Sequence, residues 1–384
     1  MNSNLCRWGF LGAAAIARKN WKAIRRSGNG VVAAVASRDR RRAQAFIDEC
    51  AAECPQVAND KVVAADAVEG YESLLNRDDI DAVYIPLPTG VRKSWVIRAA
   101  QAGKHVLCEK PVAINADEAK AMIDACRSAG VQFMDGVMFD HSARLDGVRS
   151  SLRDTETFGS LQRINTHFSF CGDESFEDSN IRAQADLEPH GCLGDLGWYC
   201  IRFTLFVTGG RMPNTVTARS LKSLGQEKQA DGTLSAGVPG TFSAEMTFDD
   251  GVSAAFYCSF LSANQQTALI SGDRGYLTLD DFVLPLYGAR SEWELHRHDL
   301  QIDNCQWNFA RKTTGMAVDE YASGQPDSQE VNMVRRLAEI ALSGRLSEHY
   351  AELSLKTQLV LDACRRSDAH GGKSVQPAPF TKAA

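Results

Sequence analysis

Three side chains of kinds that handle protons stand at positions suited to catalysis. Lys110 lies in the segment Glu109-Lys110-Pro111, directly after a short strand-like run at 105–108, and Asp195 and Tyr199 are four residues apart. On a helix, residues four apart share a face. A lysine ammonium can stabilise negative charge that develops on a substrate oxygen, and it lowers the pKa of a nearby phenol. The three residues therefore predict acid–base catalysis, with Asp195 binding a substrate hydroxyl and holding the ammonium of Lys110.

Each of these residues also has a purely structural interpretation. Lys110 could end a strand at the surface, Asp195 could cap the N-terminus of a helix, and Tyr199 could be a half-buried core residue. The sequence alone leaves these alternatives open, because the distances between the three side chains depend on the fold.

The first 140 residues alternate strand and helix signals. Apolar, strand-like runs occupy 5–11, 31–36, 81–87, 105–108 and 132–136, and helical patterns occupy 16–27, 40–54, 91–102 and 115–128. Asp39 and Asn115 stand where helix N-caps are expected. Strands that are apolar on both faces and alternate with helices are typical of a parallel sheet covered on both sides. Ligands bind beyond the carboxyl ends of such strands, and Lys110 is predicted to lie there.

The first strand leads into a turn of small residues, Gly12-x-Ala14-x-x-Ala17. The dinucleotide-binding fingerprint is G-x-G-x-x-G, in which small residues let the backbone approach a pyrophosphate at a helix N-terminus. Alanine is accepted at the third glycine position, and at the second it holds the backbone slightly further away. We expect Gly12, Ala14, Ala15 and Ile16 to contact the cofactor. A tight turn that binds nothing is the alternative.

The second strand ends at Ser37 and Arg38. A site selective for NAD places Asp or Glu near this point to bind the ribose hydroxyls. Ser37 can donate to a phosphate, and the guanidinium of Arg38 can pair with the 2′-phosphate of NADP. Asp39 comes one residue too late in this register. The sequence therefore favours NADP over NAD, although Arg38 could also be an ordinary surface arginine.

After about residue 140 the pattern changes to alternating strands joined by hairpin turns. Strands are expected at 161–171, 241–248, 252–260, 267–271 and 276–279, and helices at 196–208, 330–342 and 351–366. Residues 224–240 are expected to form an exposed loop, and the tail after Gly371 to fray. We therefore predict an α/β protein with a dinucleotide-binding Rossmann domain at 1–140. A substrate-binding α+β domain with an open, mostly antiparallel sheet follows at 141–384, and its last helix, at about 351–367, is expected to pack back on the first domain.

The composition excludes several classes of protein. The net charge of −6 argues against a nucleic-acid-binding surface. The 11 cysteines form no C-x-x-C pair, so we expect no metal site and a reducing compartment, the cytoplasm. No apolar run reaches the ~18 residues of a membrane span, and the first residues do not resemble a secretory leader.

Several segments together resemble one enzyme family. They are Gly9-x-x-Gly12, the run from Tyr84 to Thr89, the run from Ala102 to Pro111, and Asp195-x-Gly197-x-Tyr199. They look like the glucose–fructose oxidoreductase/inositol dehydrogenase/rhizopine catabolism (Gfo/Idh/MocA) family over about residues 5–370. Tyr199 stands where inositol dehydrogenases have histidine. This is similar to glucose–fructose oxidoreductase, dihydrodiol dehydrogenases and NADP-linked xylose dehydrogenases.

The resemblance implies roles for further residues. Lys110 matches the catalytic lysine of the family and can also touch the cofactor. Other expected cofactor contacts are Pro86, Leu87, Pro88, Thr89 and Glu109. Arg182 and His190 are expected beside the substrate, together with His141. The family commonly assembles as homodimers or homotetramers through the second sheet. Arg92, which stands where many relatives have histidine, departs from the family pattern and leaves the substrate open.

The function that we predict is hydride transfer between a nicotinamide cofactor and a sugar, polyol or diol. Two alternatives are a sugar oxidoreductase that keeps its cofactor tightly bound and a non-enzymatic sensor or regulator that binds a dinucleotide. The Glu109-Lys110-Pro111 element and Tyr199 favour an enzyme, because a sensor has no need of a proton donor.

Overall fold

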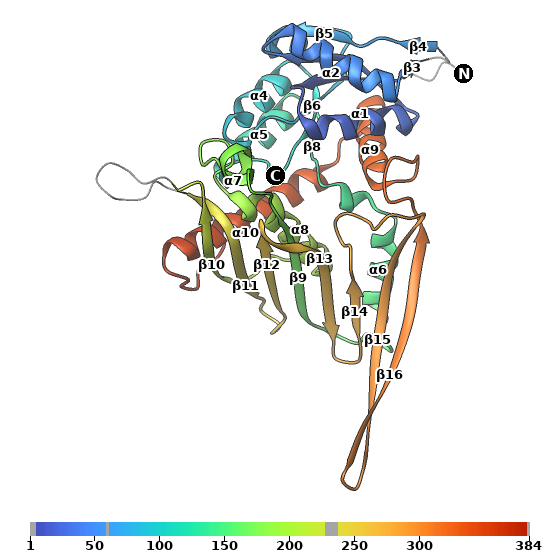
Figure 1. Ribbon diagram of the computed structural model, residues 1–384, viewed down its shortest axis with the longest axis vertical. Helices are drawn as coiled ribbons and strands as arrows, with labels where there is room; N and C mark the ends of the chain where they lie inside the picture. The colour runs from blue at the N-terminus through green and yellow to red at the C-terminus, as the bar shows by residue number, and fades with distance from the viewer. Residues whose placement is uncertain (1–4, 59–60, 227–236, 382–384) are drawn as a thin grey trace.

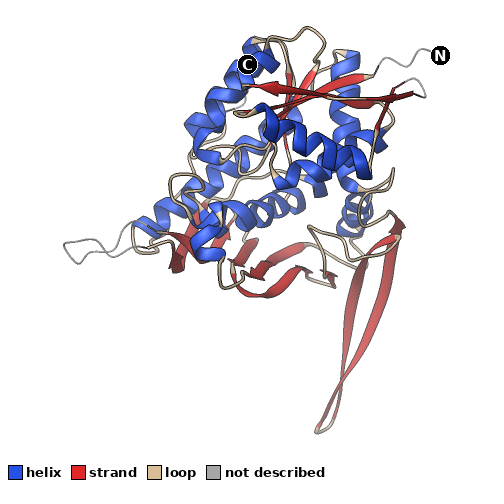
Figure 2. Cartoon of the chain, turned by 45° about the horizontal axis from the view of Figure 1, so that its top comes forward, coloured by secondary structure: helices blue, strands red, loops and turns tan. Residues whose placement is uncertain are grey.

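The fold has two large sheets with helices packed between them (Figure 1, Figure 2). A third sheet is small and pairs only β3 (Gln56–Ala58) with β4 (Lys61–Val63). The computed structural model describes residues 5–58, 61–226 and 237–381. The smaller of the two large sheets carries the N-terminal half of the chain, and the larger sheet lies at the other end of the molecule with helices on one of its faces.

The six-stranded sheet is parallel throughout and runs in the order β5-β2-β1-β6-β7-β8. Its strands are β1 (Cys6–Leu11), β2 (Gly30–Ser37), β5 (Asp66–Glu69), β6 (Ala82–Ile85), β7 (His105–Cys108) and β8 (Phe133–Asp135). The helices between them are α1 (Ala15–Ser27), α2 (Arg40–Glu53), α3 (Tyr71–Leu75), α4 (Thr89–Gln101) and α5 (Ala116–Ser128). This is the strand order of a dinucleotide-binding Rossmann fold. From β1 the chain first adds strands on one side, to β5, and then on the other side, from β6 to β8, so the switch point lies between β1 and β6. The predicted fold class is confirmed.

Local signals in the sequence explain the ends of these helices. The side chain of Asp39 accepts a hydrogen bond from the amide of Arg41 at the start of α2. Asn115 accepts one from the amide of Glu118 at the start of α5. Gly28 adopts the left-handed conformation that ends α1, with φ of 79°. Both predicted N-caps are confirmed.

The second sheet has eight strands in the order β10-β11-β12-β9-β13-β14-β15-β16. They are β9 (Leu161–Cys171), β10 (Thr215–Leu224), β11 (Val238–Thr247), β12 (Ser253–Ser259), β13 (Leu261–Gly272), β14 (Tyr276–Leu279), β15 (Arg290–Asp303) and β16 (Gln306–Asp319). Both predicted hairpins, β11–β12 and β13–β14, are confirmed. β12 and β9 pair in parallel, and the other neighbouring strands of this sheet pair antiparallel.

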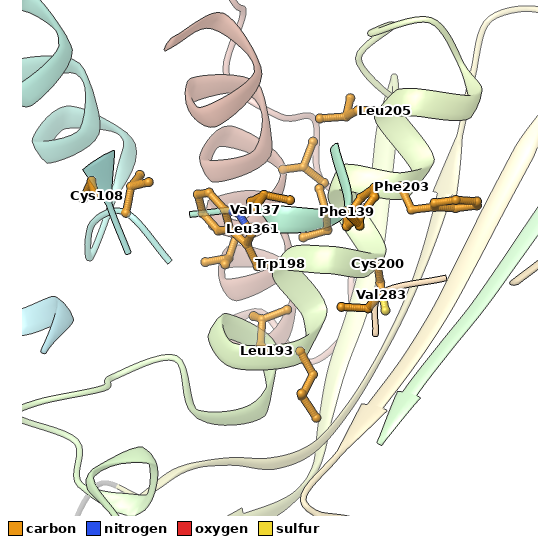
Figure 3. Close-up of a cluster of buried hydrophobic side chains, with 14 of the residues drawn as sticks. Cys108, Val137, Phe139, Leu193, Trp198, Cys200, Phe203, Leu205, Val283 and Leu361 are labelled. Atoms are coloured by element: carbon orange, nitrogen blue, oxygen red, sulfur yellow. The ribbon is translucent and has the colours of Figure 1, made fainter. Parts of the chain in front are cut away.

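The helices of the second half connect the two sheets. They are α6 (Arg144–Arg153), α7 (Phe176–Ser179), α8 (Trp198–Val207), α9 (Gln329–Ser343) and α10 (Glu348–Ala369), with single-turn helices at Met138–His141, Ile181–Ala183 and Leu193–Gly197. α9 packs on α1, and α10 lies between α5 and β10. Figure 3 shows part of the shared core, in which Trp198 and Phe203 of α8 meet Phe139 and Leu361. α8 therefore has a fixed position relative to both sheets.

One prediction for the second half lies mostly outside the described residues, and another is wrong. The predicted loop at 224–240 falls largely on 227–236, which the structure does not describe; its ends are shorter than predicted, since Leu224 belongs to β10 and Val238 to β11 and both are buried in the core. The tail does not fray after Gly371, since Val375 exchanges backbone hydrogen bonds with Val216 of β10.

The hairpin of β15 and β16 extends far beyond the rest of the sheet (Figure 1, Figure 2). We call residues 297–312 the arm. Directly opposed residues of antiparallel strands point to the same face, and the pairs Leu300–Phe309 and Ile302–Trp307 are directly opposed. These four apolar side chains share one face of the arm and are between 44% and 67% exposed.

All eleven cysteines are free thiols. Among the described residues, no helix is long and apolar enough to cross a membrane.

Candidate active site

β1 is followed by a short turn and by the solvent-exposed N-terminus of α1. Gly12 has a φ of 123°, which side chains rarely tolerate. Ala14, Ala15 and Ile16 follow at the exposed start of α1, where the first N–H groups of a helix have no intrahelical partner. The small side chains and the free donors fit a pyrophosphate at this end of the sheet. Ser37 and Arg38 lie next to it, at the end of β2, with Ser37 buried and Arg38 exposed.

Arg92 ties the neighbouring turns together. Its guanidinium is buried and donates to the carbonyl oxygens of Leu87, Glu109 and Pro111. The β6–α4 turn and the end of β7 therefore form one unit. Sequence reasoning treated Arg92 only as a departure from the family pattern, because a sequence does not show which carbonyls an arginine can reach.

The Glu109-Lys110-Pro111 element places the Lys110 side chain toward the second domain. The carboxylate of Glu109 accepts a hydrogen bond of 2.6 Å from the Tyr84 hydroxyl and a weaker one from the amide of Lys110. The Lys110–Pro111 peptide bond is cis.

Lys110 and Asp195 form a largely buried ion pair. Nζ of Lys110 is 2.6 Å from Oδ1 of Asp195 and 2.9 Å from the Asp195 carbonyl oxygen. Nε of Arg182 is 2.8 Å from the other carboxylate oxygen. Burial is the largest single influence on both groups and opposes both charges. Asp195 and Tyr199 together outweigh it at Lys110, and Lys110 and Arg182 together outweigh it at Asp195, so the pKa of Lys110 is raised and that of Asp195 is lowered. Asp195 is therefore an ionised carboxylate held between two cations, and not a helix cap.

Asp195 lies in a single turn of π-helix, Leu193–Gly197, directly before α8. Two glycines permit this close packing. A Cβ on Gly194 would lie 2.7 Å from the Cβ of His190, and one on Gly197 would lie 2.9 Å from a methyl group of Leu193. The glycines thus let the turn approach Pro111 and bring Asp195 within reach of Lys110.

Tyr199 lies in the first turn of α8, and its ring faces the ammonium of Lys110, with Nζ 4.7 Å from the ring centroid. The predicted convergence of the lysine and the tyrosine is present. The predicted lowering of the Tyr199 pKa is wrong. Burial raises it to about 12 and outweighs Lys110, while Glu109 and Asp195 raise it further. The phenol is therefore a neutral hydroxyl, which suits a proton donor.

These side chains lie on the wall of a cavity of about 650 Å³. Pro86, Leu87 and Pro88 line its first-domain side together with Glu109 and Ile16. Phe168 of β9 and residues of the loop that follows β14 line the other side. Among the residues predicted to bind substrate, Lys110, Arg182, Asp195 and Tyr199 line this cavity.

Two predicted pocket histidines lie elsewhere. His190 is buried beside Gly194, and burial together with the Arg365 cation lowers its pKa to about 4. His141 stacks on Tyr350 at 5.6 Å. Neither is among the residues that line the cavity. Their positions next to the site in the chain suggested contact, but their rings pack into the protein.

Thr89, a predicted cofactor contact, makes a different bond. Its hydroxyl donates to the carboxylate of Glu188 at 2.6 Å. Its amide also donates to Glu188. This contact links the start of α4 to the segment before the π-helix, so it connects the cofactor side of the site to the side that carries Asp195.

Both halves of the chain match known family models. Residues 6–137 match the model described as "Oxidoreductase family, NAD-binding Rossmann fold", and residues 150–278 match "GFO/IDH/MocA C-terminal domain". The chain belongs to the Gfo/Idh/MocA family. It is an NAD(P)-dependent oxidoreductase of that family, and the comparisons favour the enzyme over the non-enzymatic sensor.

Individual Gfo/Idh/MocA proteins show the range of relatives. The chain is 32% identical to a dTDP-3,4-didehydro-2,6-dideoxy-alpha-D-glucose 3-reductase of Streptomyces antibioticus, over 94% of the chain and 96% of the relative. It is 30% identical to the trans-1,2-dihydrobenzene-1,2-diol dehydrogenase of Sus scrofa, over 72% and 74%. A solved 3-ketoreductase of Actinomadura kijaniata, in complex with NADP and TDP-benzene, is 27% identical. It superposes with a TM-score of 0.76 over 95% of this chain and 98% of that one.

Sequence reasoning about this Gfo/Idh/MocA chain missed the outer part of the cavity. Gln266 of β13 and the loop residues Leu284 and Leu286 line it. The loop holds no catalytic motif, and its hydrophobic residues resemble core positions. The exposure of Leu284 and Leu286, directly after three buried residues, became visible only in the fold.

Proposed function

We propose that this protein catalyses NADP(H)-dependent interconversion of a secondary alcohol and a ketone or aldehyde in a sugar, polyol or diol. The observation that carries the proposal is the Lys110 ammonium, held by Asp195 above the Tyr199 ring on the wall of the cavity. These groups lie beyond the carboxyl ends of the Rossmann strands, where ligands of such sheets bind.

The cofactor site that we propose combines three segments. Gly12, Ala14, Ala15 and Ile16 would hold the pyrophosphate, as their small side chains and the open start of α1 permit. Pro86 to Pro88 and Glu109 would line the nicotinamide end, and Thr89, bonded to Glu188, would position the start of α4 beside it. The bound nicotinamide supplies or accepts the hydride.

Ser37 and Arg38 support the preference for NADP. β2 ends at these two residues, with no Asp or Glu in the position that binds the ribose hydroxyls in NAD-selective sites. The exposed guanidinium of Arg38 is free to turn toward a 2′-phosphate. The structure of the Actinomadura kijaniata relative with NADP agrees with this choice.

The side chains would divide the proton chemistry between them. In the reducing direction the neutral phenol of Tyr199 donates its proton to the substrate oxygen, and the Lys110 ammonium stabilises the negative charge that develops there. Oxidation is the reverse. Asp195 orients the ammonium and binds a neighbouring hydroxyl, and Arg182 keeps Asp195 ionised. Arg182 thus acts through Asp195, and His190 is not proposed as a substrate ligand.

The test is a fluorescence titration of the protein with NADPH and NADH, followed by a panel of carbonyls, sugars and cyclic diols with the better cofactor. We expect tighter binding of NADPH and turnover of at least one hydroxylated ring compound. Binding of neither cofactor, or failure of the whole panel to change NADPH absorbance, would refute the proposal.

We also infer that the protein acts as a homodimer or homotetramer in the cytoplasm. The apolar face of the arm, Leu300, Ile302, Phe309 and Trp307, supports the assembly, because a two-stranded hairpin is only marginally stable when it is isolated in water. Eleven free cysteines support a reducing compartment.

A further inference from the structure

The cavity has a buried floor and an exposed mouth of different chemistry. The floor contains Lys110 and Asp195, whose side chains are 11% and 14% exposed. At the mouth, Ile181, Leu284 and Leu286 also line the cavity, and they are 41%, 47% and 63% exposed. Large apolar side chains thus lie at the entrance to a polar reaction centre.

The loop that carries Leu284 and Leu286 is fixed in place. Asp281, Phe282 and Val283, which directly precede Leu284, are buried. The buried ion pair between Arg144 of α6 and Asp281 attaches the start of the loop to the protein.

Hydrogen bonds hold the exposed part of the same loop. The side-chain amide of Gln266 accepts from the amide of Leu284 at 2.7 Å and donates to its carbonyl oxygen. The amide of Leu286 donates to the carboxylate of Asp281 at 2.7 Å. Hydrogen bonds therefore fix the backbone that carries the two leucines. Their side chains remain exposed at the mouth of the cavity without packing into the core.

The charges at the mouth do not suit a phosphorylated ligand. The cations among the described lining residues are Arg92, Lys110 and Arg182. Arg92 and Lys110 are bonded to protein oxygens near the floor. The Arg182 side chain is 41% exposed, but its Nε is paired with the carboxylate of Asp195. The exposed lining residues beside the leucines are the amides Asn264 and Gln265 and the carboxylate Asp280. A diphosphate at this position would face Asp280 with no free lysine or arginine among these exposed lining residues to bind it.

We propose that the mouth is a subsite for an uncharged apolar substituent of the substrate, such as the aromatic ring of an aryl glycoside. The hydroxylated ring of the substrate then reaches Lys110 and Tyr199, while the substituent lies against Ile181, Leu284 and Leu286. This inference rests on the proposed oxidoreductase function and names its substrate class: neutral, amphiphilic hydroxylated rings, in contrast to nucleoside-diphosphate sugars.

The experiment compares methyl β-D-glucopyranoside, phenyl β-D-glucopyranoside and dTDP-glucose with the full-length protein and NADP. Each compound is tested as a substrate and as a competitive inhibitor of the best compound of the functional panel. We expect the phenyl glucoside to bind roughly tenfold or more tightly than the methyl glucoside, because its ring leaves water. dTDP-glucose is expected to bind no better than the methyl compound.

Variants locate the subsite. Leu286→Ser should lower the phenyl-to-methyl ratio of kcat/KM or of inhibition several-fold, whereas Leu221→Ser should leave it unchanged. Leu221 is a matched control, because it is similarly exposed, at 54%, and does not line the cavity. The wild-type ratio tests the inference even if a variant fails to fold.

The outcomes separate the two proposals. If the panel is turned over but the phenyl and methyl glucosides bind equally, or dTDP-glucose binds most tightly, the subsite is wrong and the oxidoreductase stands. If Leu286→Ser changes only the oligomeric state, the mouth is an interface between copies of the chain and the subsite is again wrong. If no compound of the functional panel reacts, the oxidoreductase itself fails.

Discussion

Asp195 accepts hydrogen bonds from two cations, and this double pairing explains how a buried carboxylate can stay charged. Burial alone raises the pKa of a carboxyl group. Lys110 and Arg182 reverse that effect at Asp195. The same pairing keeps the Lys110 ammonium charged above the ring of Tyr199. The protonation states of the site therefore depend on one another.

Arg182 provides a test of that dependence. In Arg182→Met, the pKa of Asp195 should rise because one of its two cations is lost, so the acid limb of the kcat/KM profile should move to higher pH. Arg182→Lys should move it less. Arg163→Met is the control, since Arg163 pairs with Glu245 on the second sheet, away from the cavity. An unchanged profile in Arg182→Met would show that Arg182 does not support Asp195.

Arg38 provides a test of cofactor choice. Arg38→Ala should weaken NADPH binding by about tenfold or more, because a charge-assisted hydrogen bond contributes roughly 1.5–3 kcal/mol, and it should change NADH binding little. Fluorescence titration of both cofactors measures the effect. Arg153→Ala, at the end of α6, is the control. Equal loss of affinity for NADPH and NADH would contradict a 2′-phosphate contact.

At the scale of elements, the turn before α8 decides which residues reach the cavity. Gly194 and Gly197 permit the π-helix, which turns Asp195 toward Lys110 and leaves His190 inside the protein. Close packing of this turn thus places Asp195 in the site and keeps His190 out of it.

The buried ring of His190 predicts a stability that depends on pH. Its pKa is lowered from 6.5 to about 4, so between these values the unfolded chain binds a proton that the folded chain does not. Stability should therefore fall as the pH drops from 6.5 toward 4. From pH 7 to pH 5 this residue alone should cost about 2 kcal/mol.

Urea unfolding at the two pH values measures this effect. His190→Gln should reduce the loss of unfolding free energy between pH 7 and pH 5, while His370→Gln, at an exposed position, should not. An equal loss in wild type and His190→Gln would contradict the assignment of a buried neutral imidazole.

The elements that the sequence predicted well are those with one dominant signal. Continuous apolar runs predicted β1, β2, β6 and β7, and alternation predicted β9 with its full range of residues. β5 was missed because Asp66-Ala67-Val68-Glu69 is a short edge strand with two apolar residues. β15 and β16 were missed because both faces of the arm are exposed and much of its sequence is polar.

The site was predicted in part for a similar reason. The motif residues Lys110, Asp195 and Tyr199 do meet in the structure. The state of the phenol and the partner of Arg182 depend on burial and distance, and neither follows from spacing along the chain. The limits of the domains, placed at residue 140, stay a prediction, since α9 and α10 contact elements of the first half of the chain.

At the scale of the molecule, the arm exposes apolar side chains that nothing in a single copy of the chain covers within the described residues. Its apolar residues continue the face of the second sheet that carries Tyr276 and His296, since these two residues are directly opposed and His296 lies on the same side of β15 as Leu300. His296 itself is buried, but Glu294, His298 and Leu300 on the same side of β15 are exposed, so this face of the sheet and the arm is available for a second copy.

Substitution of Trp307 and Phe309 by serine should weaken the assembly. Light scattering coupled to gel filtration should show wild type above the monomer mass of 41.9 kDa and the double variant shifted toward it. Asn308→Ser is the control, because Asn308 points to the opposite face of the arm. A wild-type monomer, or an unchanged mass in the double variant, would contradict assembly through the arm.

The central claim is that Lys110 and Tyr199 act together on the substrate oxygen beside the nicotinamide. The most direct measurement is kcat/KM of Lys110→Ala and Tyr199→Phe for the best substrate, with NADPH affinity measured on the same preparations. We predict that each variant loses at least about a hundredfold in turnover, as expected when a general acid or its electrostatic partner is removed, and retains cofactor binding. Near-normal turnover in both variants would contradict the account.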